Sequence, residues 1–235
     1  MKGLLILTGE SFRLGGQYTR NIGSDNSYLE QINAAKSHIH FLEHLKENQN
    51  CDMDVYIASY NTKFNNELIS IYSNYLIGYN YYENLIGQPN LMNNSLTNIQ
   101  NIEIYDFILF MRIDIFLKTE FSRVFDCKSE LILFPSICFK PYHKVGIHPR
   151  VNDMMLYFPK KYFNYLKHAA MYVGHEQWYN FIENTDLQYD DLGTMINTFH
   201  DSDSAKDWNP LYYIVNREES KIFHTKDEIF DKYNF

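Results

Sequence analysis

The chain has 235 residues, a length typical of one or two domains, and 45% of them are hydrophobic, which is enough for a full core. Its 21 basic and 29 acidic side chains give a formal net charge of −8. Binding to nucleic-acid phosphates needs a broad basic surface, so a nucleic-acid partner is not expected. The 20 Tyr and 17 Phe suit a carbohydrate or nucleotide cleft. The many Asn, Ile, Lys and Tyr are also what AT-rich codons encode.

The three cysteines form no C-x-x-C pair and cannot all be paired, so neither a disulfide scaffold nor a cysteine zinc site is expected. The apolar run at residues 3–7 is short for a signal peptide, which has about 7–15 apolar residues. No segment reaches the roughly 18 apolar residues of a membrane span. We therefore expect a cytoplasmic protein without a transmembrane segment.

The first 75 residues alternate between strand and helix patterns. Short apolar runs at residues 3–7 and 54–59 predict buried strands. Between them, Ser27-x-x-Glu30 is a capping box, and apolar residues then recur at spacings of three and four, which predicts a helix. The members of this stripe are Tyr28, Ile32, Ala35, Ile39, Leu42 and Leu45. A second helical stripe runs from Phe64 to Tyr75. This order predicts a parallel sheet covered by helices.

The rest of the chain continues the alternation without a repeat, a linker or a charge block, so residues 1–235 are expected to form a single domain. The most apolar stretch, residues 107–111, predicts a central buried strand. Residues 78–104 have poor periodicity and predict a loop, with a short helix near 91–99. The remaining predicted elements are strands at 131–135, 154–158 and 212–216, a helix opened by Pro159, a helix from His175, and a helix at about 188–199 with Asp190 and Asp191 at its start.

The segment Arg112-Ile113-Asp114 follows the central strand directly. Residues i and i+2 of a strand face the same side, so we expect Arg112 and Asp114 to point together at the carboxyl end of the strand. Ligands of open α/β sheets bind at that end. A carboxylate there can hold a hard divalent cation, and an adjacent Arg can bind a phosphate. A structural salt bridge is the alternative.

The loop after the first strand contains Gly9, Arg13, Gly15 and Gly16. Glycines let a backbone approach a ligand closely. The loop has neither the G-x-x-x-x-G-K-[ST] pattern of a P-loop nor the Rossmann G-x-G-x-x-G pattern. It predicts either an ordinary βα turn or, paired with Arg112 and Asp114 on the same sheet, a nucleotide site.

These features resemble the GT-A class of nucleotide-sugar-dependent glycosyltransferases. In that class an apolar strand is followed by Asp-x-Asp, and here residues 107–111 are followed by Arg112-Ile113-Asp114, which keeps the second carboxylate. The resemblance implies an α/β, single-domain, Rossmann-type fold with a mainly parallel central sheet flanked by helices. Residues 1–117 would form the nucleotide-sugar-binding half and residues 118–235 the acceptor-side half. The AT-rich residue usage suits a giant virus, acting in the host cytoplasm, or a low-GC bacterium.

The resemblance also implies an activity, namely hexosyl or pentosyl transfer (EC 2.4) from a nucleotide-diphosphate sugar to a hydroxyl acceptor in glycan synthesis. Asp114 would hold Mn²⁺ or Mg²⁺ on the donor diphosphate. The donor contacts would be Thr8, Gly9, Arg13, Ser59 and Arg112. Inverting members use a carboxylate as base, for which Glu176, in Gly174-His175-Glu176, and Asp153, beside the strand at 154–158, are the candidates. The alternatives are a helix-dipole carboxylate for Glu176 and a turn or cap residue for Asp153.

Other functions and sites stay open. A non-catalytic nucleotide-sugar or carbohydrate-binding protein would explain the missing first carboxylate of the motif. A sugar-phosphate nucleotidyltransferase would normally carry a G-x-G-x-R-type loop, which the loop from Gly9 to Gly16 fits poorly. The basic residues 140–150 form either a loop that closes over the diphosphate or an acidic acceptor, or a plain surface loop. His40 and His44 have zinc-ligand spacing, but a solvated helix face is the expected role.

Overall fold

The computed structural model describes residues 1–12, 27–134, 137–138, 150–151, 154–170, 189–191 and 211–215. The elements in chain order are β1 (Lys2–Gly9), α1 (Ser27–Gln49), β2 (Asp52–Tyr60), α2 (Asn65–Tyr72), β3 (Leu76–Tyr82), α3 (Gln88–Asn98), η1 (Ile102–Ile104), β4 (Phe107–Arg112), β5 (Ile115–Leu117), α4 (Thr119–Val124), β6 (Ile132–Phe134), β7 (Ile137–Cys138), β8 (Arg150–Val151), β9 (Met155–Pro159), η2 (Lys160–Tyr162), α5 (Phe163–Ala170), β10 (Tyr189–Asp191) and β11 (Tyr212–Ile214).

Within the described residues, seven strands form the central sheet in the order β10-β6-β9-β4-β1-β2-β3. The strands β3, β2, β1 and β4 run parallel to one another. Strand β9 is antiparallel to both β4 and β6, and β10 is parallel to β6. The predicted mainly parallel sheet is therefore confirmed. The carboxyl ends of β1, β2 and β4 meet at one edge, which is where open α/β sheets bind ligands.

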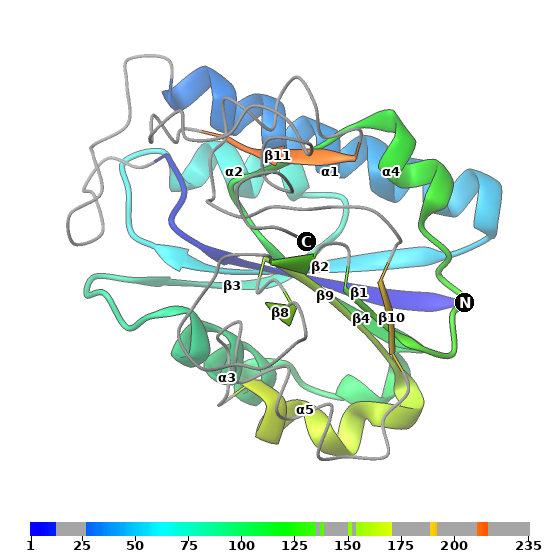
Figure 1. The fold of residues 1–235 in the computed structure, drawn as a ribbon. Coiled ribbons are helices and arrows are strands. Elements are labelled where there is room, and N and C mark those ends of the chain that lie inside the picture. Colours follow the sequence, from blue (N-terminus) through cyan, green and yellow to red (C-terminus); the bar gives the residue numbers. More distant parts are fainter. Residues whose placement is uncertain are drawn as a thin grey trace, which may run out of the picture.

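Helices cover both faces of this sheet (Figure 1). Because side chains alternate along a strand, Leu5 and Leu7 of β1 join a core with α1, α2 and α4, whereas Leu4 and Ile6 join a core with α3 and α5. All four of these leucine and isoleucine side chains are completely buried. The strands are covered on both sides, and this is why they appear in the sequence as continuous apolar runs.

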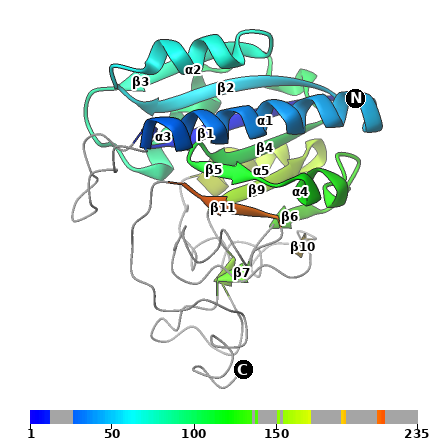
Figure 2. The same ribbon diagram turned by 90° about the horizontal axis from the view of Figure 1, so that it is seen from above.

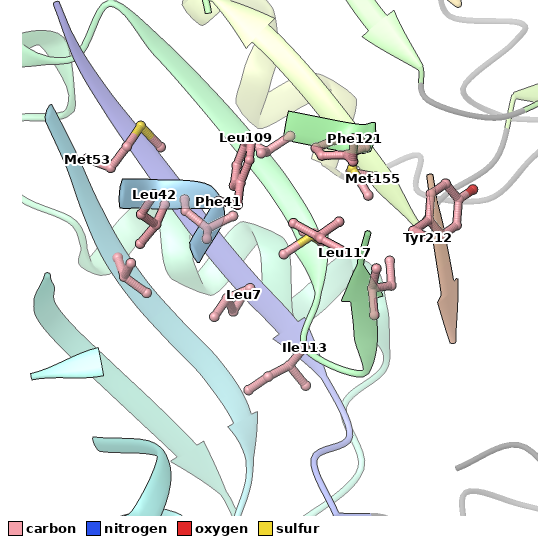
Figure 3. Packing of buried hydrophobic residues seen from close by; sticks show 14 of the residues in the cluster. Leu7, Phe41, Leu42, Met53, Leu109, Ile113, Leu117, Phe121, Met155 and Tyr212 are labelled. Atoms are coloured by element: carbon pink, nitrogen blue, oxygen red, sulfur yellow. The ribbon is translucent and has the colours of Figure 1, made fainter. Parts of the chain in front are cut away.

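Helix α1 packs on the sheet through the stripe that the sequence predicts. Ala35, Leu42 and Leu45 are buried in the larger core, and the other three stripe residues pack against it while partly exposed. Figure 3 shows members of this core, among them Leu7 and Leu109. The side chain of Ser27, the predicted capping residue, lies outside the described residues.

Two local predictions were wrong. The predicted loop from residue 78 begins inside β3, an edge strand whose side chains are mostly half-exposed and which is ordered by pairing with β2. Tyr189–Asp191, the predicted start of a helix, is a strand because its backbone pairs with β6. In both cases backbone pairing in the folded protein overrides the local pattern. The helix predicted after Pro159 is confirmed as α5, except that Pro159 is the last residue of β9 and the first turn is η2.

The predicted late strand is confirmed as β11, which pairs antiparallel with β5 beside the main sheet. Helix α3 begins three residues before the helix expected at 91–99. The helix expected from His175 lies outside the described residues. Among the residues that the structure describes, no helix combines the length and apolar character of a membrane span.

Candidate functional site

Arg112 and Asp114 form a closely paired ion pair at the carboxyl end of β4. Arg112 is the last residue of β4, and Ile113 and Asp114 form the turn before β5. Arg112 Nε donates to Asp114 Oδ1 at 2.8 Å, and Nη2 donates to Oδ2 at 2.5 Å. The Asp114 side chain is completely buried, and the Arg112 side chain is 12% exposed. The two side chains point together as predicted, but a turn rather than continued strand alternation brings them together.

The neighbouring strands bring three more predicted residues to this pair. Thr8 lies opposite Arg112 in the β1–β4 register, and Gly9 lies opposite Ser59 in the β1–β2 register. The backbone N–H of Ile113 donates to Thr8 O at 2.8 Å. Ser59 Oγ donates to Gly9 O, also at 2.8 Å. The predicted donor contacts in the described part of the chain therefore converge at one edge of the sheet.

Most of these side chains are enclosed by protein. Thr8 and Ser59 have no exposed area. Gln88 Nε2 donates to Thr8 Oγ1 at 2.6 Å, and Ser59 Oγ lies 3.2 Å from Ser11 Oγ. Among the predicted donor contacts that the structure describes, Arg112 is therefore the one whose side chain combines charge with exposure. Planar guanidinium groups bind phosphate and carboxylate in bidentate geometry, so an anionic ligand is the chemistry that this edge favours.

Gly9 sits at the point where β1 turns into the loop. Its φ of 105° lies in the region that side chains with a Cβ rarely adopt, so glycine is required by the backbone there. A Cβ at this position would find its nearest neighbour at 3.8 Å, the Oε1 atom of Gln88. Backbone conformation rather than crowding explains this glycine.

The donor set around Asp114 does not by itself fit a divalent cation. Both carboxylate oxygens already accept hydrogen bonds from Arg112. The described residues contain no group of three His, Cys, Asp or Glu side chains placed to hold a metal ion. Protein sites for Mg²⁺ use one or two carboxylates with substrate phosphates, so a metal here would need ligands beyond the described residues.

Sequence reasoning missed Gln31 and His38, two completely buried polar residues of α1. Gln31 Nε2 donates to Ile113 O at 2.8 Å, in the turn that carries Asp114. A signal for both residues existed in the sequence. Tyr28, Gln31, Ala35, His38, Leu42 and Leu45 follow one another at spacings of three and four, so Gln31 and His38 interrupt the apolar face of the helix.

His38 is held between two hydrogen-bond partners. Its Nε2 lies 2.6 Å from Ile115 O, and its Nδ1 lies 2.6 Å from the Tyr72 hydroxyl. Because a carbonyl only accepts, Nε2 carries the proton and the Tyr72 hydroxyl donates to Nδ1. Burial lowers the pKa of His38 to about 4, although the Ile115 carbonyl and the Asp114 charge act in the opposite direction. The imidazole is therefore neutral at physiological pH.

A cavity of about 750 Å³ lies elsewhere, between α1 and the segment from β5 to α4. Its lining includes His40 and His44, the pair with zinc-ligand spacing. His40 is exposed and lies 3.4 Å from Glu43, and His44 contacts Asn48, as expected for a solvated helix face. Cys51 and Cys127 are buried free thiols.

Four further predictions fall on residues whose placement is not described. Arg13, a predicted donor contact, and Asp153 and Glu176, the two candidate bases, lie outside the described residues. So do residues 140–149 of the basic loop. These assignments stay predictions.

Comparison with solved structures identifies the architecture. A protein of Desulfovibrio desulfuricans G20 assigned as a nucleotide-diphospho-sugar transferase aligns over 99% of this chain and 94% of its own, with 10% identity and a TM-score of 0.58. This chain has a GT-A-like fold. No protein-family model and no curated protein sequence matches it.

Two looser structural similarities involve glycosyltransferases. One is Drosophila β-1,4-galactosyltransferase 7 in complex with manganese, UDP-Gal and xylobiose, at 13% identity over 97% of this chain and 79% of that chain, with a TM-score of 0.48. The other is a glycosyltransferase involved in glycosylation of the major capsid of PBCV-1, at 7% identity over 99% of each chain, with a TM-score of 0.44.

Proposed function

We propose that this GT-A-like chain is a glycosyltransferase that moves a sugar from a nucleotide-diphosphate sugar to a hydroxyl acceptor. The observation that carries the proposal is the position of the Arg112–Asp114 pair, which follows β4 directly at the carboxyl edge of the sheet, beside the end of β1. Ligands of open α/β sheets bind at this edge. The chemistry of the pair selects an anionic ligand, and the diphosphate of a nucleotide sugar is such a ligand.

Arg112 is proposed to bind the donor diphosphate. Two hydrogen bonds to Asp114 hold the guanidinium of Arg112, whose side chain is 12% exposed. Because the side chain is already ordered, little conformational entropy would be lost when a ligand binds. A fixed cation also stabilises the negative charge that develops on the diphosphate as the bond to the sugar breaks. Asp114 is proposed to orient this cation.

The proton of the acceptor hydroxyl needs a base. As the acceptor oxygen attacks the anomeric carbon, the bond from that carbon to the diphosphate oxygen breaks, and a carboxylate takes the hydroxyl proton. Glu176 and Asp153 are proposed for this role on the basis of their sequence context. Binding of Mn²⁺ or Mg²⁺ through Asp114 is a separate prediction, and no step above depends on it.

A thermal-shift screen of the purified protein tests the proposal. UDP, GDP, CDP and dTDP sugars are each added with and without Mn²⁺, because a ligand that binds the folded state raises the unfolding midpoint. A shift with one nucleotide family supports the proposal and identifies the donor base. A shift that requires Mn²⁺ supports a metal at Asp114, and a shift without Mn²⁺ supports a diphosphate contact through Arg112 and the basic loop at residues 140–150.

Three outcomes contradict the proposal. If no nucleotide sugar raises the unfolding midpoint, the protein has no donor-binding site of the proposed kind. Turnover is measured as release of free nucleoside diphosphate in the presence of a panel of sugar acceptors. A thermal shift without such release favours a non-catalytic nucleotide-sugar-binding protein. Formation of a nucleotide sugar from a nucleoside triphosphate and a sugar phosphate would identify a nucleotidyltransferase instead.

A further inference from the structure

A row of polar side chains on α1 hydrogen-bonds the backbone that follows β4. Gln31 Nε2 donates to Ile113 O at 2.8 Å, and His38 Nε2 lies 2.6 Å from Ile115 O. The N–H of Leu117 donates to Ser37 Oγ at 2.9 Å. These contacts fall on alternate residues, 113, 115 and 117, which present their backbone groups to the same edge.

The other edge of this segment is paired with β11. Strands β5 and β11 are antiparallel, and Val215 N donates to Asp114 O at 2.8 Å. Figure 2 shows β5 between α1 and β11. Side chains of a helix therefore take the place that a further strand would occupy. Because buried backbone groups are costly to leave unpaired, this row holds the segment from Ile113 to Leu117 against α1, and Gln31 is its member at the Asp114 turn.

Gln31 differs from the other two members because it also contacts the loop after β1. The N–H of Phe12 donates to Gln31 Oε1 at 3.2 Å. Phe12 adopts a φ of 58°, and its buried ring packs on Tyr28 and Phe64 at centroid distances of 5.7 and 5.1 Å. One amide thus joins the loop that follows Gly9 to the turn that carries Asp114.

We infer that Gln31 is a positioning residue that couples the loop after β1 to the Arg112–Asp114 turn. The amide suits this role because it accepts from one segment and donates to the other at the same time. For its effect on ligand binding the inference rests on the proposed function, since the coupled segments carry the proposed donor contacts. Residues that hold contacting residues in place typically change affinity or activity by about 10–100-fold when replaced.

The test compares Gln31→Met with Ser37→Ala. Methionine keeps a similar length and volume but makes neither hydrogen bond, whereas Ser37→Ala removes the bond to Leu117 and leaves both coupled segments intact. Gln31→Asn, which is one methylene shorter and cannot span both partners, is the milder second variant. Backbone hydrogen exchange followed by mass spectrometry reads the two segments, residues 8–12 and 112–114, without any ligand.

We expect Gln31→Met and Gln31→Asn to increase exchange in both segments together and to weaken binding of the nucleoside diphosphate that stabilises the wild type most, by about tenfold. Ser37→Ala should lower the unfolding midpoint while leaving exchange in those segments and binding unchanged. Increased exchange in only one segment, or a loss of affinity no larger than in Ser37→Ala, overturns the inference. If the wild type binds no nucleoside diphosphate, the proposed function fails, and exchange alone decides whether Gln31 couples the segments.

Discussion

The buried carboxylate of Asp114 accepts two hydrogen bonds from one guanidinium, that of Arg112. The carboxylate has no exposed area, and the guanidinium belongs to a side chain that is 12% exposed. The two members of the ion pair therefore differ in their access to solvent. The anion is enclosed by protein, whereas the side chain that carries the cation keeps some exposed area at the carboxyl end of β4.

Asp114→Asn should destabilise the fold and weaken donor binding. The amide keeps the shape of the carboxylate but removes its charge, and breaking a buried pair by removing one partner costs about 3–5 kcal/mol. Urea unfolding should therefore show a lower free energy of unfolding, and the nucleotide-sugar shift and transfer should be lost. Glu120→Gln is the control, because Glu120 and Arg123 form an exposed pair at 3.9 Å whose loss should cost less than about 1 kcal/mol. Unchanged donor binding in Asp114→Asn would show that the Arg112–Asp114 pair takes no part in binding the donor.

His38 should make the protein less stable as the pH falls from 6.5 towards 4. Burial lowers its pKa to about 4 from an ordinary value of 6.5, so between these values the unfolded chain binds a proton that the folded chain does not. The free energy of unfolding therefore falls with decreasing pH by about 3 kcal/mol in total, and is unaffected by this residue above pH 6.5.

Urea midpoints at pH 7.5, 6 and 5 measure this effect. The comparison variant is His38→Gln, in which the titrating group is absent and the remaining ionisable groups are the same. The wild type should lose more stability than His38→Gln between pH 6.5 and 5. Parallel pH profiles for the two proteins would show that folding does not lower the pKa of His38.

Gly3→Ala should destabilise the core strongly. A Cβ at Gly3 would overlap the ring of Phe107 and the sulfur of Met53, both of which are buried. Overpacking of a tight core typically costs about 1–3 kcal/mol. Gly78→Ala is the matched control, because its Cβ, on the edge strand β3, would meet the Tyr56 ring at 3.0 Å, a tight contact but not an overlap. A larger loss of thermal stability in Gly78→Ala than in Gly3→Ala would contradict this packing.

The sequence by itself determined the elements whose pattern repeats locally. A buried strand or an amphipathic helix needs its apolar residues at fixed spacings. These spacings predict strands for the apolar runs of β1, β2, β4 and β9 and a helix for the stripe of α1. The short motif Arg112-Ile113-Asp114 was predictable for the same reason, since it interrupts the end of the most apolar strand with two charges.

Tertiary structure alone decided the elements that depend on a partner far along the chain. Strand β3 has no strong alternation of apolar and polar residues, and it forms because its backbone pairs with β2. Strand β10 lies in a segment predicted to be helical, and it forms because its backbone pairs with β6. The roles of Gln31 and His38 likewise require the folded chain, because their hydrogen-bond partners lie 82 and 77 residues away. Local sequence sets which backbone conformations are favourable, and only long-range packing decides which buried polar groups meet.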